Sequence, residues 1–143
     1  RARKNEYRNS RSPPMPKKPT IEPTRAELEI LQLVWEHGPS TVRQIHDELS
    51  RRRKTGYTTT LKLMQIMAQK GLLQRDESTR THLYRDAQPR EKTQRQLVTT
   101  LIQRAFDGSA AGLVMQALSA QKTSAEELAE IRRLLDLLEE EGD

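Results

Sequence analysis

Two helix-start signals lie close together in the first half of the chain. Thr24 precedes Glu27 by three residues, and Thr41 precedes Gln44 in the same way. A hydroxyl followed at this spacing by Glu or Gln is the pattern of a capping box, and apolar residues at helical spacing follow each one. The sequence therefore predicts a helix from Thr24 that ends at the His-Gly-Pro of residues 37–39, and a second helix from Thr41.

A third helix and a hairpin are predicted next. The helix should run from about residue 58 to Lys70, because Gly71 supplies the left-handed residue that commonly ends a helix. Two short alternating segments, residues 72–76 and 81–85, then flank a polar turn, which is typical of a β-hairpin. Three helices followed by a two-stranded ribbon form a winged helix-turn-helix, which we predict over residues 23–87.

The last third of the chain is predicted to be helical, with Ser109 and Ser124 as helix caps. Three amphipathic helices in so short a segment need a partner surface, and an identical chain is the simplest supplier. We expect residues 88–143 to form a helical dimerisation domain. The apolar positions assigned to the dimer are Leu97, Leu101, Leu113, Leu128, Ile131, Leu135 and Leu138, the last four with 3-4-3 spacing. The predicted fold class is mainly α with a small β-hairpin.

Charge is distributed unevenly along the chain, whose formal net charge is +5. Residues 1–20 carry seven basic side chains and one acidic, whereas residues 89–143 carry seven and ten. We expect residues 1–22 to be a disordered basic arm, because they hold little that could be buried. A basic front and an acidic rear indicate a half that binds a polyanion joined to a half that interacts with protein, although ordinary solvated surfaces would give the same gradient.

Several function classes find no support in the sequence. Cysteine is absent, which excludes disulfides, thiolate metal sites and thiol catalysis. No apolar run reaches the roughly 18 residues of a membrane span, so we expect a cytoplasmic protein without membrane insertion. No catalytic motif occurs, and the histidines lack ligand spacing, so we predict neither an enzyme nor a cofactor or metal. His37, His46 and His82 are expected to face solvent or to cap helices.

The two faces of the predicted third helix differ in chemistry. Leu61, Met64 and Ala68, with Leu63 or Met67, are predicted to face the core. The other side shows Thr59, Lys62, Gln65 or Ile66, and Gln69, with Thr58 and Thr60 at the start. Residues 55–70 contain no acidic side chain that would repel phosphate. Short hydroxyl, amide and lysine side chains can reach base edges, so we predict base contacts from Thr58, Thr59, Lys62 and Gln65.

Basic and polar residues on both sides of this helix are suited to phosphate contacts, which position a protein on DNA without reading its sequence. Four consecutive basic residues precede the helix, and others lie on or beside the hairpin. The predicted backbone contacts are Thr41, Arg51, Arg52, Arg53, Lys54, Tyr57, Arg75, Arg80, His82 and Arg85.

Several segments together resemble the penicillinase-repressor family, which includes the BlaI, MecI and CopY regulators. They are PTRAELEIL (residues 23–31), VW (34–35), GYTTT (56–60), KGLLQR (70–75) and Tyr84, within a resemblance that covers residues 23 to about 138. The resemblance implies a transcriptional repressor with an N-terminal winged helix, bound as a homodimer to a palindromic operator in double-stranded DNA. It implies that Thr58, Thr59 and Lys62 meet DNA and that Tyr57 opens the recognition helix.

The resemblance also implies a way of releasing DNA. Members of this family are typically inactivated when a membrane-bound sensor protease, or a protease that it triggers, cuts the dimerisation region. The family's Asn-Phe cleavage site aligns here with Gln116-Ala117, a departure from the family pattern. The cysteine pairs of the copper-responsive branch are absent.

A hypothesis from another class stays open on the sequence alone. The winged helix would then be only a scaffold for a protein-interaction adaptor without sequence-specific DNA binding, and the leucine-rich tail would recruit a different partner.

Overall fold

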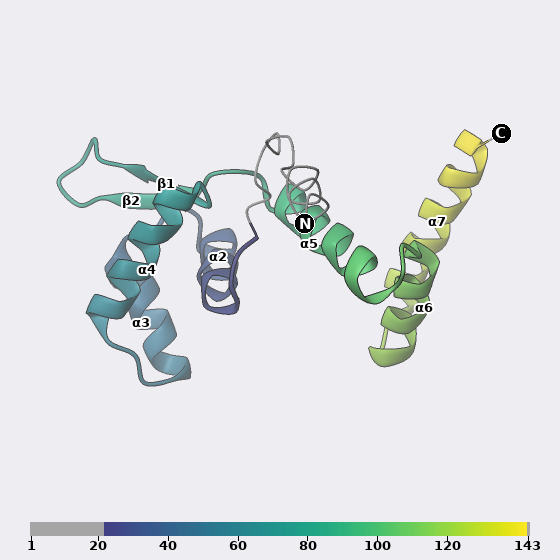
Figure 1. Ribbon diagram of the computed structural model, residues 1–143, viewed down its shortest axis with the longest axis horizontal. Coiled ribbons are helices and arrows are strands. Elements are labelled where there is room, and N and C mark those ends of the chain that lie inside the picture. The colour runs from purple at the N-terminus through teal and green to yellow at the C-terminus, as the bar shows by residue number, and fades with distance from the viewer. Residues whose placement is uncertain (1–21, 143) are drawn as a thin grey trace, which may run out of the picture. The chain divides into compact units, whose positions relative to one another are not determined.

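The computed structural model describes residues 22–142, which form a mainly helical chain with one antiparallel hairpin. The elements are α2 (Arg25–His37), α3 (Val42–Arg52), α4 (Tyr57–Lys70), β1 (Leu73–Asp76), β2 (Leu83–Asp86), α5 (Arg90–Ala105), α6 (Ala110–Ala120) and α7 (Ala125–Gly142) (Figure 1). The predicted arm, residues 1–22, lies outside the described residues except for Glu22. By compactness the chain divides into two units between Gln94 and Arg95; the domain boundary at residue 88 stays a prediction.

Both capping boxes are confirmed. The N–H of Glu27 donates to Thr24 Oγ1 at 3.2 Å, and the N–H of Thr24 donates to Glu27 Oε1 at 2.9 Å. The second box, at Thr41 and Gln44, closes with distances of 3.1 and 2.8 Å. Gly71 ends α4 in the left-handed conformation, with φ 86°, as predicted. These local signals fix where α2 and α3 begin and where α4 ends.

The first unit is built on one apolar core. Helix α2 contacts α3, α4 and β2, while α4 also packs against α3 and β1. The buried apolar side chains are Ile30, Leu31, Leu33, Val34, Val42, Ile45, Leu49, Met64, Met67, Leu72, Leu73 and Tyr84. Strands β1 and β2 pair antiparallel, with Arg75 opposite Tyr84. The N–H of Ser40 donates to the Tyr84 carbonyl at 2.9 Å and the reverse bond is 2.8 Å, which attaches the hairpin to the turn between α2 and α3. This is the predicted winged helix-turn-helix.

A partly buried ion pair joins the start of α2 to the end of α4. Lys70 Nζ donates to both carboxylate oxygens of Glu27, at 2.7 and 2.9 Å, and the Glu27 side chain is 4% exposed. Burial raises the pKa of Glu27, but hydrogen bonds from Lys70 and Thr24 and the charge of Lys70 together outweigh that effect. The pKa of Glu27 is therefore lowered from its ordinary value of 4.5.

Two local predictions are wrong. Thr60 is fully buried, because a helix that starts at Tyr57 places it on the same face as Met64 and Met67, and its hydroxyl donates to the Gly56 carbonyl at 3.4 Å. His46 neither faces solvent freely nor caps a helix: its ring is partly buried and packs edge-on against Tyr57.

The second unit consists of helices that bury little. Ser109 caps α6 by accepting the Gly112 N–H at 2.9 Å, and Ser124 and Glu127 form the predicted box before α7. None of residues 95–142 has a buried side chain, and α5, α6 and α7 make only sparse contacts with one another. These helices therefore lack the shared core that normally stabilises short helices in water.

Replacing Lys70 with Met should lower the free energy of unfolding by about 1–3 kcal/mol, because it leaves the Glu27 carboxylate buried without its cation. Urea denaturation at pH 7 measures the change. Arg51→Met is the matched control, since it removes an exposed pair with Glu48 (2.9 Å) and should cost less than about 0.5 kcal/mol. Equal losses in the two variants would contradict a structural role for the buried pair.

Acid should remove the contribution that the ionised Glu27 carboxylate makes to the free energy of unfolding. Because the pKa of Glu27 is lower in the folded chain, the contribution is complete above the ordinary pKa of 4.5 and is lost as the pH falls through the lowered value. The wild type should therefore lose more unfolding free energy than Glu27→Gln between about pH 5 and pH 3. Urea unfolding of both proteins across this range gives the comparison; parallel curves would rule the linkage out.

Candidate nucleic-acid interface

Helix α4 presents one polar face to the outside. Thr58, Thr59, Lys62, Gln65 and Gln69 are exposed, whereas Thr60, Met64 and Met67 on the opposite side are buried in the core. We call these five exposed residues the outward face of α4. The four residues predicted to contact bases all belong to it. The face carries a lysine and no carboxylate. Neutral and cationic side chains of this length can approach the edges of base pairs.

A packed cluster of three side chains lies at the start of α4. The Arg43 guanidinium of α3 lies over the Tyr57 ring, 4.4 Å from its centroid. The His46 ring meets the same tyrosine at 79° and 5.6 Å between centroids. These contacts hold the first turn of α4 against α3 through cation–π and edge-to-face attraction. Sequence reasoning missed Arg43, because only the fold brings it to Tyr57.

The four basic residues before α4 are not equivalent. Arg51 pairs with Glu48 at 2.9 Å, Arg52 lies 3.7 Å from Glu29, and Arg53 also pairs with Glu29. Lys54 is exposed and has no ion pair within residues 22–142. Arg52 and Arg53 thus bind α2 as well as facing solvent, and Lys54 is the residue whose charge is least compensated.

The hairpin carries carboxylates as well as cations. Arg75 binds Glu77 at 2.7 Å, and its pKa is raised further by hydrogen bonding with the Tyr84 side chain and then with Glu77. Hydrogen bonds from Ser78 lower the pKa of Asp76, which favours the negatively charged form of this carboxylate. The remaining predicted contacts, Arg80, His82 and Arg85, are all exposed, and Arg85 donates to Gln74 at 3.3 Å.

Thr41 lies outside the outward face of α4. Its side-chain oxygen accepts the Gln44 N–H at 3.1 Å in the capping box at the start of α3. The hydroxyl hydrogen stays available for a phosphate oxygen. Thr41 therefore has a structural role as the cap of α3, whether or not it also binds a phosphate.

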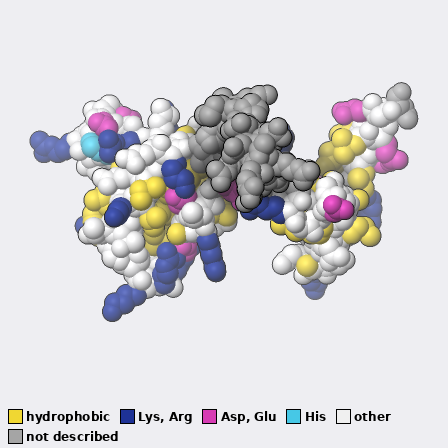
Figure 2. Space-filling view, viewed as in Figure 1, with side chains coloured by type: hydrophobic (Ala, Val, Ile, Leu, Met, Phe, Trp, Pro, Cys, Tyr) yellow, Lys and Arg dark blue, Asp and Glu magenta, His cyan; other side chains and the backbone are white. Residues whose placement is uncertain are grey.

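The residues assigned to dimerisation are partly or fully exposed. Leu97, Leu113, Leu128 and Ile131 are half-buried, whereas Leu101, Leu135 and Leu138 are exposed. Other large apolar side chains of this unit are exposed as well: Val98, Val114, Met115, Leu118, Leu134 and Leu137. Figure 2 shows such hydrophobic side chains at the surface of this unit. The Leu-Leu-Asp-Leu-Leu run of residues 134–138 could have predicted a wider apolar surface on this helix. A strict heptad assignment takes only one leucine of each pair and therefore leaves out Leu134 and Leu137.

Gln116 and Ala117, the pair that the family resemblance singles out, lie inside α6. Both side chains are exposed. They are close in sequence to the exposed Val114, Met115 and Leu118, so this bond lies within the apolar surface of the second unit.

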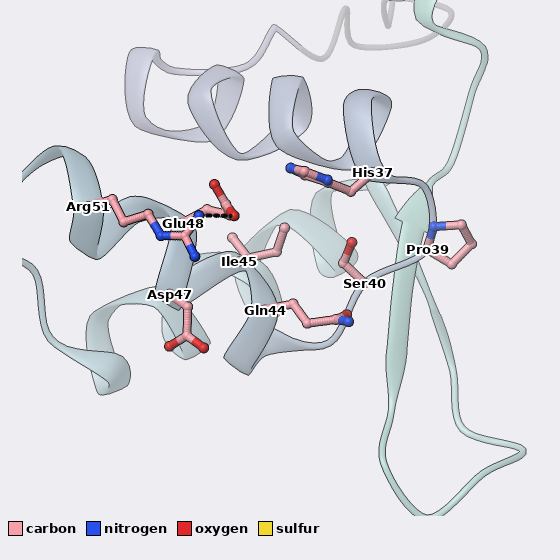
Figure 3. A pocket seen from close by; sticks show the side chains of 8 residues that line it. All are labelled: His37, Pro39, Ser40, Gln44, Ile45, Asp47, Glu48 and Arg51. Carbon is pink, nitrogen blue, oxygen red and sulfur yellow. Dashed lines mark hydrogen bonds and ion pairs between the residues drawn. The ribbon is translucent and has the colours of Figure 1, made fainter.

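A pocket of about 350 Å³ lies between the end of α2 and α3, lined by His37, Pro39, Ser40, Gln44, Ile45, Asp47, Glu48 and Arg51 (Figure 3). Its polar groups are largely held locally: the Ser40 hydroxyl donates to the Gly38 carbonyl at 2.7 Å, and Arg51 binds Glu48. A ligand site usually offers a few convergent free polar groups on an apolar lining, which this pocket does not.

Two further searches cover the described part of the chain. Across residues 22–142, no three His, Asp or Glu side chains are grouped so as to hold a metal ion. In the same span, no helix combines the length and hydropathy that crossing a bilayer requires.

Comparison with known proteins places the chain in a family. Residues 23–137 match the family model described as penicillinase repressor. The chain is 30% identical over 115 residues to "Transcriptional regulator BlaI" from two strains of Mycobacterium tuberculosis, covering 79% of this chain and 82% of each relative. A solved structure of a MarR family protein from Bacillus stearothermophilus aligns with 98% of this chain and 82% of its own, at 22% identity and a TM-score of 0.46. The family match spans both the winged helix and the leucine-rich helices, and the chain belongs to the penicillinase repressor family of transcriptional regulators.

Proposed function

We propose that this chain is a homodimeric repressor in which each protomer inserts α4 into the major groove of one half of a palindromic operator. The observation that carries this proposal is the outward face of α4, where five exposed polar side chains include Lys62 and no carboxylate. A helix of this chemistry at the second position of a helix-turn-helix is suited to reading base edges. Family membership as a transcriptional regulator supports the same function.

The positions of the basic residues support contacts to the DNA backbone. Lys54 stands just before α4, and Arg80 lies in the turn of the hairpin, so uncompensated cations lie on both sides of the reading helix. Such residues bind phosphates irrespective of sequence and set the orientation of the helix in the groove. We propose that Arg52 and Arg53 reach phosphates while they remain close to Glu29.

The exposed apolar surface of the second unit supports a homodimer. Leu134, Leu135, Leu137 and Leu138 on α7 are each 53–55% exposed, and Met115 on α6 is 66% exposed. Helices without a core of their own gain stability when a second copy covers such side chains. A symmetric pair would also present two copies of α4, with half-sites about one helical turn, or a multiple of it, apart.

We propose that repression ends when a protease linked to a sensor cuts the helices of the second unit. Gln116-Ala117 departs from the family's Asn-Phe pair, so the proposal concerns α6 as a whole and not this bond. Cleavage of α6 would divide the apolar surface that carries Val114, Met115 and Leu118.

Thr59→Ala should weaken binding to the operator more than binding to random DNA, by about 1–3 kcal/mol if the side chain contacts a base. Fluorescence anisotropy with an operator selected from a random DNA pool, and with a scrambled duplex, measures both affinities at one salt concentration. Lys54→Gln is the matched control: it should weaken both duplexes alike and reduce the slope of log K against log salt by roughly 1.

Equal losses on the two duplexes for Thr59→Ala would exclude base readout by this residue. A wild-type protein that retained no duplex in the presence of excess random DNA would instead favour the adaptor hypothesis.

Leu135→Glu should convert the protein from dimer to monomer at about 10 µM, because a buried, unpaired carboxylate in the dimer costs several kcal/mol. Sedimentation equilibrium measures the mass, and operator affinity should fall with it. Glu130→Gln, at an exposed position of the same helix, should leave the dimer intact. A wild-type chain that is monomeric at this concentration would refute the dimer.

A further inference from the structure

A shallow hollow lies on α4 among the residues proposed to read DNA. Thr58, Thr59, Lys62, Leu63 and Ile66 line it, its volume is about 250 Å³, and its lining is mainly apolar. The rest of the outward face consists of Gln65 and Gln69, whose amide groups make it more polar than the hollow. The aliphatic side chains of Leu63 and Ile66 in this hollow cannot form hydrogen bonds, so this part of the lining is suited to an apolar group.

Ile66 is not explained by the core. Leu61, Leu63 and Ala68 of the same helix are partly buried and pack against the core cluster, and Ile66 is not one of these residues. A β-branched residue also forms helix slightly less readily than an unbranched one. Its aliphatic surface is instead partly exposed in the hollow, beside Thr59 and Lys62.

The major groove of DNA offers one apolar group among its donors and acceptors, the 5-methyl group of thymine. Building on the proposed function, we infer that the hollow formed with Leu63 and Ile66 receives a thymine 5-methyl group in each operator half-site. Thr58, Thr59 and Lys62 on its rim supply donors for the neighbouring O4 acceptor of the same base or for a phosphate. Ile66 is thus a specificity-determining residue that polar-contact reasoning overlooks.

The test couples a change in the protein to removal of a single methyl group from the DNA. Full-length wild-type protein first selects an operator from a random duplex pool. Each thymine of that operator is then replaced in turn by deoxyuridine, which pairs identically and lacks only the methyl group. At one position in each half-site, the wild type should bind the deoxyuridine duplex about fourfold more weakly than the thymine duplex. This is the effect expected when one methyl-sized group is no longer buried.

Ile66→Ala should bind the thymine and deoxyuridine duplexes equally at that position. Gln69→Ala, on the same helix but outside the hollow, should keep the fourfold difference. Thermal melting by circular dichroism checks that both variants are folded, which is expected because neither side chain belongs to the core.

Three results would overturn the inference. Deoxyuridine could leave wild-type affinity unchanged at every position, or Ile66→Ala could retain the wild-type ratio between the two duplexes. In either case sequence-selective binding would still stand, and only the methyl contact would be lost. Failure to select any operator would instead refute the proposed function and the inference together.

Discussion

The Glu27–Lys70 ion pair is the interaction on which the arrangement of the first unit depends. Its carboxylate belongs to the first turn of α2, where it also completes a capping box, and its ammonium group ends α4 just before Gly71. One buried side chain therefore ties the start of α2 to the end of α4, which is separated from β1 by two residues. Because a buried carboxylate without a cation is costly, these two helix ends are stabilised together.

Electrostatics separates the basic residues into two groups. Glu29, Glu48 and Glu77 compensate several arginines within the fold, whereas Lys54 and Arg80 have no ion pair within residues 22–142. A count of cations along the sequence would treat all of them as equal contributors to DNA affinity. In the structure, Arg52 and Arg53 also join α3 and the segment after it to α2 through Glu29, so under the proposed function the unpaired cations should contribute more to DNA affinity. The measured salt dependence of binding should therefore reflect the free cations most strongly.

Local chemistry made much of the fold predictable, and long-range contacts account for what was missed. The Thr24 and Thr41 caps, the Gly71 stop and the alternating hairpin segments each depend on neighbours within a few residues, so they can be read from sequence. Arg43 over Tyr57 and Arg53 beside Glu29 join residues that only the folded chain brings together. Thr60 was misplaced although its spacing is local: it precedes the core residue Met64 by four residues on the same helix face, and its hydroxyl is satisfied by the Gly56 carbonyl.

The hairpin is fastened to the turn between α2 and α3 by the two main-chain bonds between Ser40 and Tyr84. Neither bond uses a side chain, so the spacing between wing and helices survives replacements along most of the hairpin surface. Exposed residues in the turn of the hairpin, such as Arg80, can consequently change without disturbing this attachment, whereas β1 packs against α4. A lineage built on this scaffold could acquire a new DNA target through a few exposed substitutions, without rebuilding the framework that aims them.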